Sequence, residues 1–227
     1  MSRTLRTEAS LIPNRRLVLS GLGLLLAARP SLAEPTTLSP EDQQAVARVV
    51  GYLQSLTTEQ GHFVQTTARG GQSEGMFYLQ RPGRARFDYD PPSGLIIASD
   101  GREVTVVDHR LKTMHVYPLS ATPLGLFLAR DIRLDRGVSI TQVDRSAGGL
   151  TIVARDSRKG ARGQIALNFA ESPLTLTGWA LTDARGGTVD LKLSGLAGAE
   201  AHDADFFKLS DPRKTRYEPQ SAANGPR

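Results

Sequence analysis

Few residues in this chain are spaced for catalysis, and this narrows the chemistry that it could perform. Its 227 residues include no cysteine, which excludes a thiol nucleophile, Cys-ligated zinc and iron–sulfur clusters. Glycine-rich phosphate loops, G-x-S-x-G and H-E-x-x-H are also missing from the sequence. His109 and His115 could meet across a hairpin, but no third metal ligand accompanies them. We therefore expect no enzyme, no metal and no cofactor, unless several titratable groups meet inside a cavity.

Arg81 stands out because it shares a strand face with apolar side chains. The alternation that begins at Met76 predicts a strand in which Phe77, Leu79 and Arg81 point the same way. A Pro82-Gly83 turn follows, and alternation resumes over residues 84–89. An exposed arginine at a strand end is the alternative interpretation of Arg81.

The elements that would position these residues are mostly strands. One amphipathic helix is predicted over about 40–57, because Ser39 can cap it and Pro40 suits its first position. From His62 onward about ten or eleven short strands follow, interrupted by a second helical segment at 122–129. Sequential antiparallel strands predict a mainly β fold, either a barrel or a strongly curved sheet whose concave side the helices close.

Residues 1–33 have the pattern of a cleavable export signal. A basic segment precedes a short apolar run over 17–28, and the small residues of Ser31-Leu32-Ala33 predict cleavage after Ala33. The apolar run is shorter than the roughly 20 residues of a membrane span, and a buried N-terminal helix or an anchor is the alternative. Asn14-Arg15-Arg16-Leu17-Val18-Leu19 resembles a twin-arginine signal, so both export routes stay open. The mature domain would cover 34–212, and 213–227 would be a polar tail.

The positive net charge is concentrated in this signal. Five arginines and a single acid, Glu8, lie in the first 33 residues, so they carry four of the five net positive charges. The mature domain is nearly neutral, and a field that attracts nucleic-acid phosphates is therefore not expected.

The stretch from Phe63 to Asp108 resembles the LolA family of periplasmic outer-membrane lipoprotein carriers. The order and spacing of its motifs agree with the family pattern over roughly 45 residues, from 63 to 108. The motifs are Phe63-Val64-Gln65-Thr66, Gly75-Met76-Phe77-Tyr78-Leu79-Gln80-Arg81-Pro82-Gly83-Arg84, Phe87-Asp88-Tyr89, Pro91-Pro92 and Ile97-Ala98-Ser99-Asp100-Gly101. One departure is Ala85, where many members carry a large aromatic residue.

The resemblance implies an incomplete, half-open antiparallel β-barrel with a helical lid over an apolar cavity. It implies a monomeric periplasmic chaperone that takes lipoproteins by their acyl chains from an inner-membrane ABC transporter to an outer-membrane receptor. In that family an arginine at the position of Arg81 ties a strand to the lid through backbone carbonyls. Six residues would form the acyl-chain cavity: Phe77, Leu79, Phe87, Leu124, Phe127 and Leu128.

A second hypothesis keeps the fold and changes the role. A periplasmic binding or sensor domain could use the same cavity for another lipid or hydrophobic ligand. The membrane-anchored receptor of similar fold needs a lipid-modified N-terminal cysteine, and the absence of cysteine disfavours that role here.

Overall fold

The computed structural model describes residues 38–122, 124–133, 138–156, 163–183 and 185–214. The predicted export signal at 1–33 lies outside the described residues, as does the predicted tail beyond residue 214.

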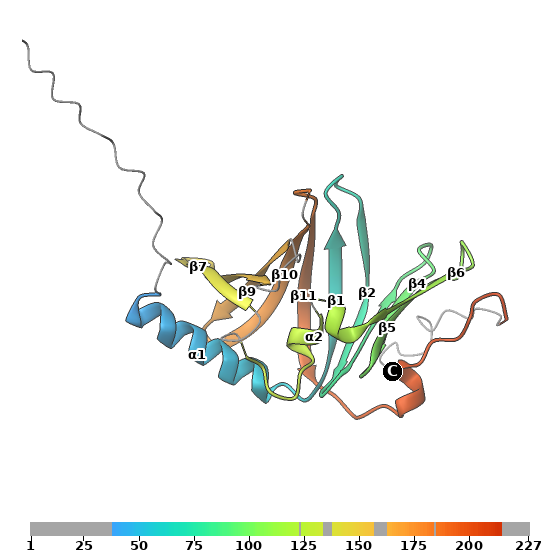
Figure 1. Ribbon diagram of the computed structural model, residues 1–227, viewed down its shortest axis with the longest axis horizontal. Coiled ribbons are helices and arrows are strands. Elements are labelled where there is room, and N and C mark those ends of the chain that lie inside the picture. Colours follow the sequence, from blue (N-terminus) through green and yellow to red (C-terminus); the bar gives the residue numbers. More distant parts are fainter. Residues whose placement is uncertain (1–37, 123, 134–137, 157–162, 184, 215–227) are drawn as a thin grey trace, which may run out of the picture. The chain divides into compact units, whose positions relative to one another are not determined.

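Eleven strands form one antiparallel sheet in the order β6-β5-β4-β3-β2-β1-β11-β10-β9-β8-β7 (Figure 1). The strands are β1 (Thr58–Thr66), β2 (Gln72–Gln80), β3 (Arg84–Tyr89), β4 (Leu95–Asp100), β5 (Glu103–Asp108), β6 (Thr113–Pro118), β7 (Val138–Ser146), β8 (Gly149–Asp156), β9 (Gly163–Glu171), β10 (Leu174–Asp183) and β11 (Thr188–Gly198). Pairing of β1 with β11 joins the two halves, and β6 and β7 are left as edges that do not pair with each other. The sheet is open, which confirms the predicted incomplete barrel.

Helices cover one face of this sheet, called the inner face below. They are α1 (Pro40–Ser55), the short helix η1 (Leu119–Ala121) and α2 (Leu124–Phe127). The predicted cap of α1 is present, since the Ser39 hydroxyl accepts a hydrogen bond from the Asp42 amide at 3.1 Å. No helix in the described ranges has the length and the apolar character needed to cross a bilayer.

The second helix is shorter than the predicted 122–129. The Leu128 carbonyl accepts a hydrogen bond from the Gly83 amide (2.7 Å), and the carbonyls of Ala129 and Arg130 accept from Arg81. These carbonyls bond to the sheet and not to a following helical turn, so the helix ends at Phe127.

The main core lies between the helices and the inner face. In α1 the side chains of Ala45, Val49 and Leu53 are buried, and α1 runs along the half of the sheet that contains β7 to β10 (Figure 1). The opposite, outer face is partly covered by η2 (Ala204–Phe207), which contacts β3 and β4.

Candidate functional site

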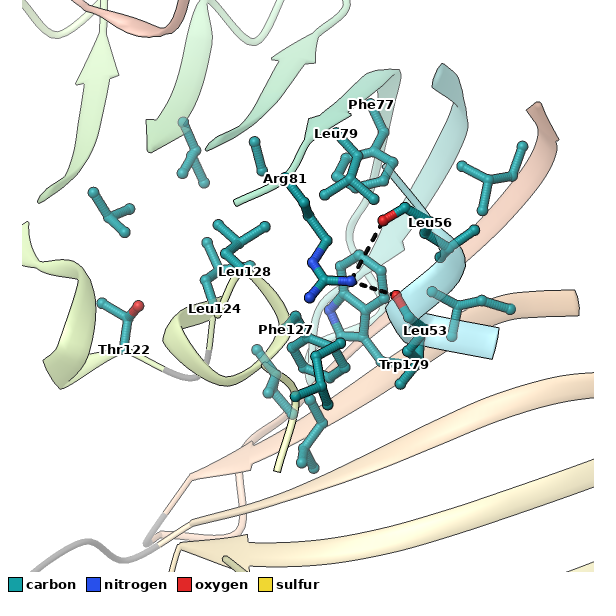
Figure 2. Close-up of a pocket in the computed structure, with 18 of the residues that line it drawn as sticks. Leu53, Leu56, Phe77, Leu79, Arg81, Thr122, Leu124, Phe127, Leu128 and Trp179 are labelled. Carbon is teal, nitrogen blue, oxygen red and sulfur yellow. Dashed lines mark hydrogen bonds between the residues drawn. The ribbon is translucent and has the colours of Figure 1, made fainter. Parts of the chain in front are cut away.

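An apolar cavity of about 290 Å³ lies between the inner face and the two helices (Figure 2). Strands β2 to β6 and β9 to β11 contribute to its lining, together with α1, α2 and the segment that follows α2. Among its lining residues, all but Arg81, Tyr117, Thr122 and Trp179 have side chains without a polar atom. Such a lining suits contact with hydrocarbon, because it offers few hydrogen-bonding partners to a polar ligand.

Arg81 connects the two helical segments that cover the cavity. Its Nη1 donates to the carbonyls of Leu53 (2.5 Å) and Leu56 (3.4 Å), the contacts dashed in Figure 2. Its Nη2 donates to the carbonyls of Ala129 (2.5 Å) and Arg130 (3.2 Å). The last turn of α1 holds no basic residue, so this guanidinium, supplied from the end of β2, is the cation that satisfies its free carbonyls.

The Arg81 guanidinium is partly shielded from solvent. Burial lowers the pKa of Arg81, and the nearby charge of Asp131 partly offsets the effect by raising it. An arginine remains protonated in spite of such a shift, because its ordinary pKa is above 12. The buried charge is therefore stabilised by the carbonyls around it, and these come from both helical segments.

Two further contacts hold the α2 segment in place. The Gly83 amide donates to the Leu128 carbonyl at 2.7 Å, and Gly83 has a φ of +84°, a conformation that glycine adopts without strain. The Gln54 side chain of α1 donates to the Arg130 carbonyl (2.6 Å) and accepts from the Ile132 amide (2.9 Å). The segment after α2 is thus joined to α1 as well as to the sheet.

The sequence of this domain matches the model of one protein family, the outer membrane lipoprotein carrier protein LolA, over residues 54–210. The chain belongs to the LolA family. The matched region contains every strand of the sheet and α2, and it begins near the end of α1.

Two curated relatives agree with this assignment. An outer-membrane lipoprotein carrier protein of Pseudomonas fluorescens is 26% identical over 196 residues, which cover 81% of this chain and 92% of the relative. The carrier protein of Methylibium petroleiphilum is 28% identical over 177 residues, covering 74% and 86% of the two chains. Among solved structures, a LolA superfamily protein from Nitrosomonas europaea covers 71% of this chain and 97% of its own, with 12% identity and a TM-score of 0.44.

Five of the six residues that the LolA resemblance assigns to the cavity lie in its lining. They are Phe77, Leu79, Leu124, Phe127 and Leu128. The sixth, Phe87, is buried but does not belong to the lining; its ring packs against that of Phe77, with centroids 4.8 Å apart. The structure thus places Phe87 behind the cavity wall.

Trp179 is a lining residue that the sequence alone did not single out. Its ring stacks on that of Phe127, with centroids 6.3 Å apart, so it joins β10 to α2 across the cavity. A bulge between Leu176 and Gly178 lets Leu176 and Trp179, three residues apart, both face the cavity. The glycine inside a strand pattern was the available signal for that bulge.

Proposed function

We propose that this LolA-family chain is a periplasmic carrier that holds the acyl chains of lipoproteins in its apolar cavity. It takes them from an ABC transporter of the inner membrane and delivers them to a receptor in the outer membrane. The observation that carries the proposal is the cavity of about 290 Å³, whose lining is almost entirely hydrocarbon. The curated relatives, which are named outer-membrane lipoprotein carrier proteins, support the same role.

The physical need for such a cavity follows from the cost of exposing lipid to water. Each buried methylene of an acyl chain is worth about 0.8 kcal/mol, so a lipoprotein does not leave a bilayer unless another apolar environment replaces it. Leu124 and Phe127 of α2, facing Phe77 and Leu79 of β2, supply that environment here. Binding hydrocarbon chains requires shape and apolar surface only, and the proposed role is therefore not enzymatic.

Delivery of the cargo requires that binding of the lipid can be reversed. In the proposed cycle the closed form, in which Arg81 joins α1 to the α2 segment, is the empty state. The open form admits lipid, and the contacts of Arg81 favour its expulsion when the lid closes again. The affinity for cargo then depends on the free-energy difference between the two forms.

The test is release of lipoprotein from membranes. Purified mature protein would be mixed with spheroplasts, and the soluble fraction would be examined for a triacylated lipoprotein in a stoichiometric complex. Leu124→Asp, which places a charge in the lining, should abolish the complex, whereas Ser194→Asp at an exposed position of β11 should not.

The outcomes separate the proposed role from its alternative. No lipoprotein released by folded wild-type protein would refute the carrier role. Recovery of some other lipid from the cavity would indicate a binding protein of the same fold.

A further inference from the structure

The two edges of the open sheet are built differently. Strand β7 carries a bulge between Ile140 and Gln142, and it contains the charged residues Asp144 and Arg145 near its end. Arg145 also forms an ion pair with Asp42 of α1 at 2.7 Å. Bulges, charges and covering helices are the devices by which proteins prevent an edge strand from pairing with another chain.

Strand β6 has no bulge and no charged residue, and Pro118 at its end is the one protective residue among its six. Its six residues, Thr113–Pro118, include no Lys, Arg, Asp or Glu, and within the described part of the chain it pairs with β5 alone. The large hydrophobic side chains that are exposed in the described residues are Leu111 (60%), Val116 (45%) and Tyr117 (49%). All three belong to β6 or to the turn before it. Tyr117 faces the cavity and its neighbour Val116 points to the other face of the sheet, so exposed apolar side chains flank this edge on both faces.

This edge is continuous with the cavity. Tyr117 lines the cavity although half of its surface is exposed, and Val104, its partner on β5, lines it too. A molecule whose lipid lies in the cavity and whose remainder extends past Tyr117 would therefore meet the free backbone groups of β6.

We propose that β6 binds the extended polypeptide segment that directly follows the lipid-bearing residue of the cargo, as an added antiparallel or parallel strand. The inference rests on the proposed carrier function. Strand addition uses main-chain hydrogen bonds, which do not depend on the added sequence, and it therefore suits a carrier of many different proteins.

A tethered segment fits this edge better than a second copy of the chain does. Stable protein–protein interfaces bury at least about 1,200 Å², which pairing along a six-residue strand does not approach. A segment whose lipid is already bound meets the edge at an effective concentration of about millimolar, so a weak contact is enough. The short, apolar β6 is thus matched to a partner that is held nearby.

The test compares three synthetic probes by fluorescence titration of Trp179, the only tryptophan, which lies in the cavity. The probes are triacylated cysteine alone, the same lipid with an uncharged ten-residue tail, and that tail methylated on its backbone nitrogens. The tail should tighten binding about tenfold, the effect of one or two net hydrogen bonds. Methylation should remove this gain.

Protein variants and hydrogen exchange locate the effect. Val116→Lys should lose the gain from the tail and keep the affinity for the lipid alone, whereas Thr141→Lys on the other edge should behave as wild type. In the wild type, the tailed lipid and not the bare lipid should protect amides of residues 113–117 from exchange.

Each contrary result has its own meaning. Lipid binding without any gain from the tail, or a gain that survives methylation, overturns the inference and leaves the carrier function intact. A failure of all three lipids to bind refutes the carrier function, and the inference with it. A dimer in sedimentation that Val116→Lys dissolves would assign the edge to a second copy and also overturn the inference.

Discussion

Replacing Arg81 with leucine should convert the protein into a tighter and slower-releasing lipid binder. The guanidinium holds the α2 side of the lid through the carbonyls of Ala129 (2.5 Å) and Arg130 (3.2 Å). In the wild type these two hydrogen bonds break when the α2 segment moves away and the lid opens. Arg81→Leu removes the same two hydrogen bonds from the closed form. The substitution therefore destabilises the closed form and leaves the open, lipid-binding form unchanged.

The size of the effect follows from the shorter of these two contacts. A hydrogen bond to a charged group contributes about 1.5–3 kcal/mol, and the partial exposure of Arg81 favours the lower part of that range. A loss of about 2 kcal/mol shifts the closed–open equilibrium roughly thirtyfold. The apparent Kd for acyl ligand should fall by up to the same factor, because a larger fraction of the protein is competent to bind.

The assay is a titration with a triacylated lipid, followed by transfer of the bound lipid to acceptor vesicles. Arg84→Leu is the matched control, since it removes an arginine next to the same turn but from the outer face of β3. Arg81→Lys should be intermediate, because a single ammonium group does not reach both helical segments as the guanidinium does. Thermal unfolding would establish that all three variants are folded.

The proposed role of Arg81 would be refuted by an Arg81→Leu protein whose Kd and transfer rate equal those of Arg84→Leu. A weaker affinity for lipid would also refute it, since that result would make Arg81 a ligand-binding residue and not a group that stabilises the closed form.

Three further substitutions test the cavity and the sheet. Gly178→Val should lower Tm sharply or prevent folding, because its Cβ would lie 2.1 Å from the Leu191 carbonyl oxygen at a φ of +148°; a normal Tm would mean that the bulge in β10 is not needed. Phe127→Ala should weaken lipid binding about tenfold and shift the fluorescence emission of Trp179. An unchanged Kd and an unchanged emission in a lipid titration would mean that the lipid binds elsewhere. Burial raises the pKa of Tyr89 to about 12, so the folded state favours the neutral phenol. The contribution of this neutral phenol to the free energy of unfolding is complete below pH 10 and is lost as the pH rises towards 12. In urea unfolding at alkaline pH, Tyr89→Phe should therefore lose less stability than the wild type does, and equal losses would contradict this.

Local signals in the sequence were sufficient to predict most of the strands and α1, whereas β1 (Thr58–Thr66) was not delimited. Alternation between one face and the other marks β2 and β3, and the Ser39 cap followed by Pro40 marks the start of α1. These signals depend on neighbouring residues only. The second helix was predicted too long, because its end is set by hydrogen bonds from Gly83 and Arg81, which come from a distant part of the chain.

The lining of the cavity was predictable only in part, for a related reason. The family resemblance pointed to residues between 77 and 128, whereas Trp179 reaches the cavity because β1 pairs with β11 and brings the C-terminal strands beside the N-terminal ones. Arg81 could be placed on an apolar face from its spacing. Its partners could not be inferred from side-chain types, because they are backbone carbonyls.

The two helices that cover the cavity are held with unequal strength. Arg145 of β7 bonds to the first turn of α1, Arg48 of α1 bonds to the end of β9, and the Tyr52 hydroxyl accepts from a backbone amide of β10. Helix α2 has only four residues, and the segment that follows it is held by Gly83 and Arg81, at the end of β2 and in its turn, and by two hydrogen bonds from Gln54 of α1. Opening the cavity therefore costs least when the α2 segment moves and α1 stays as a fixed wall. Arg81, which bonds to both, lies at the joint between the fixed and the moving part.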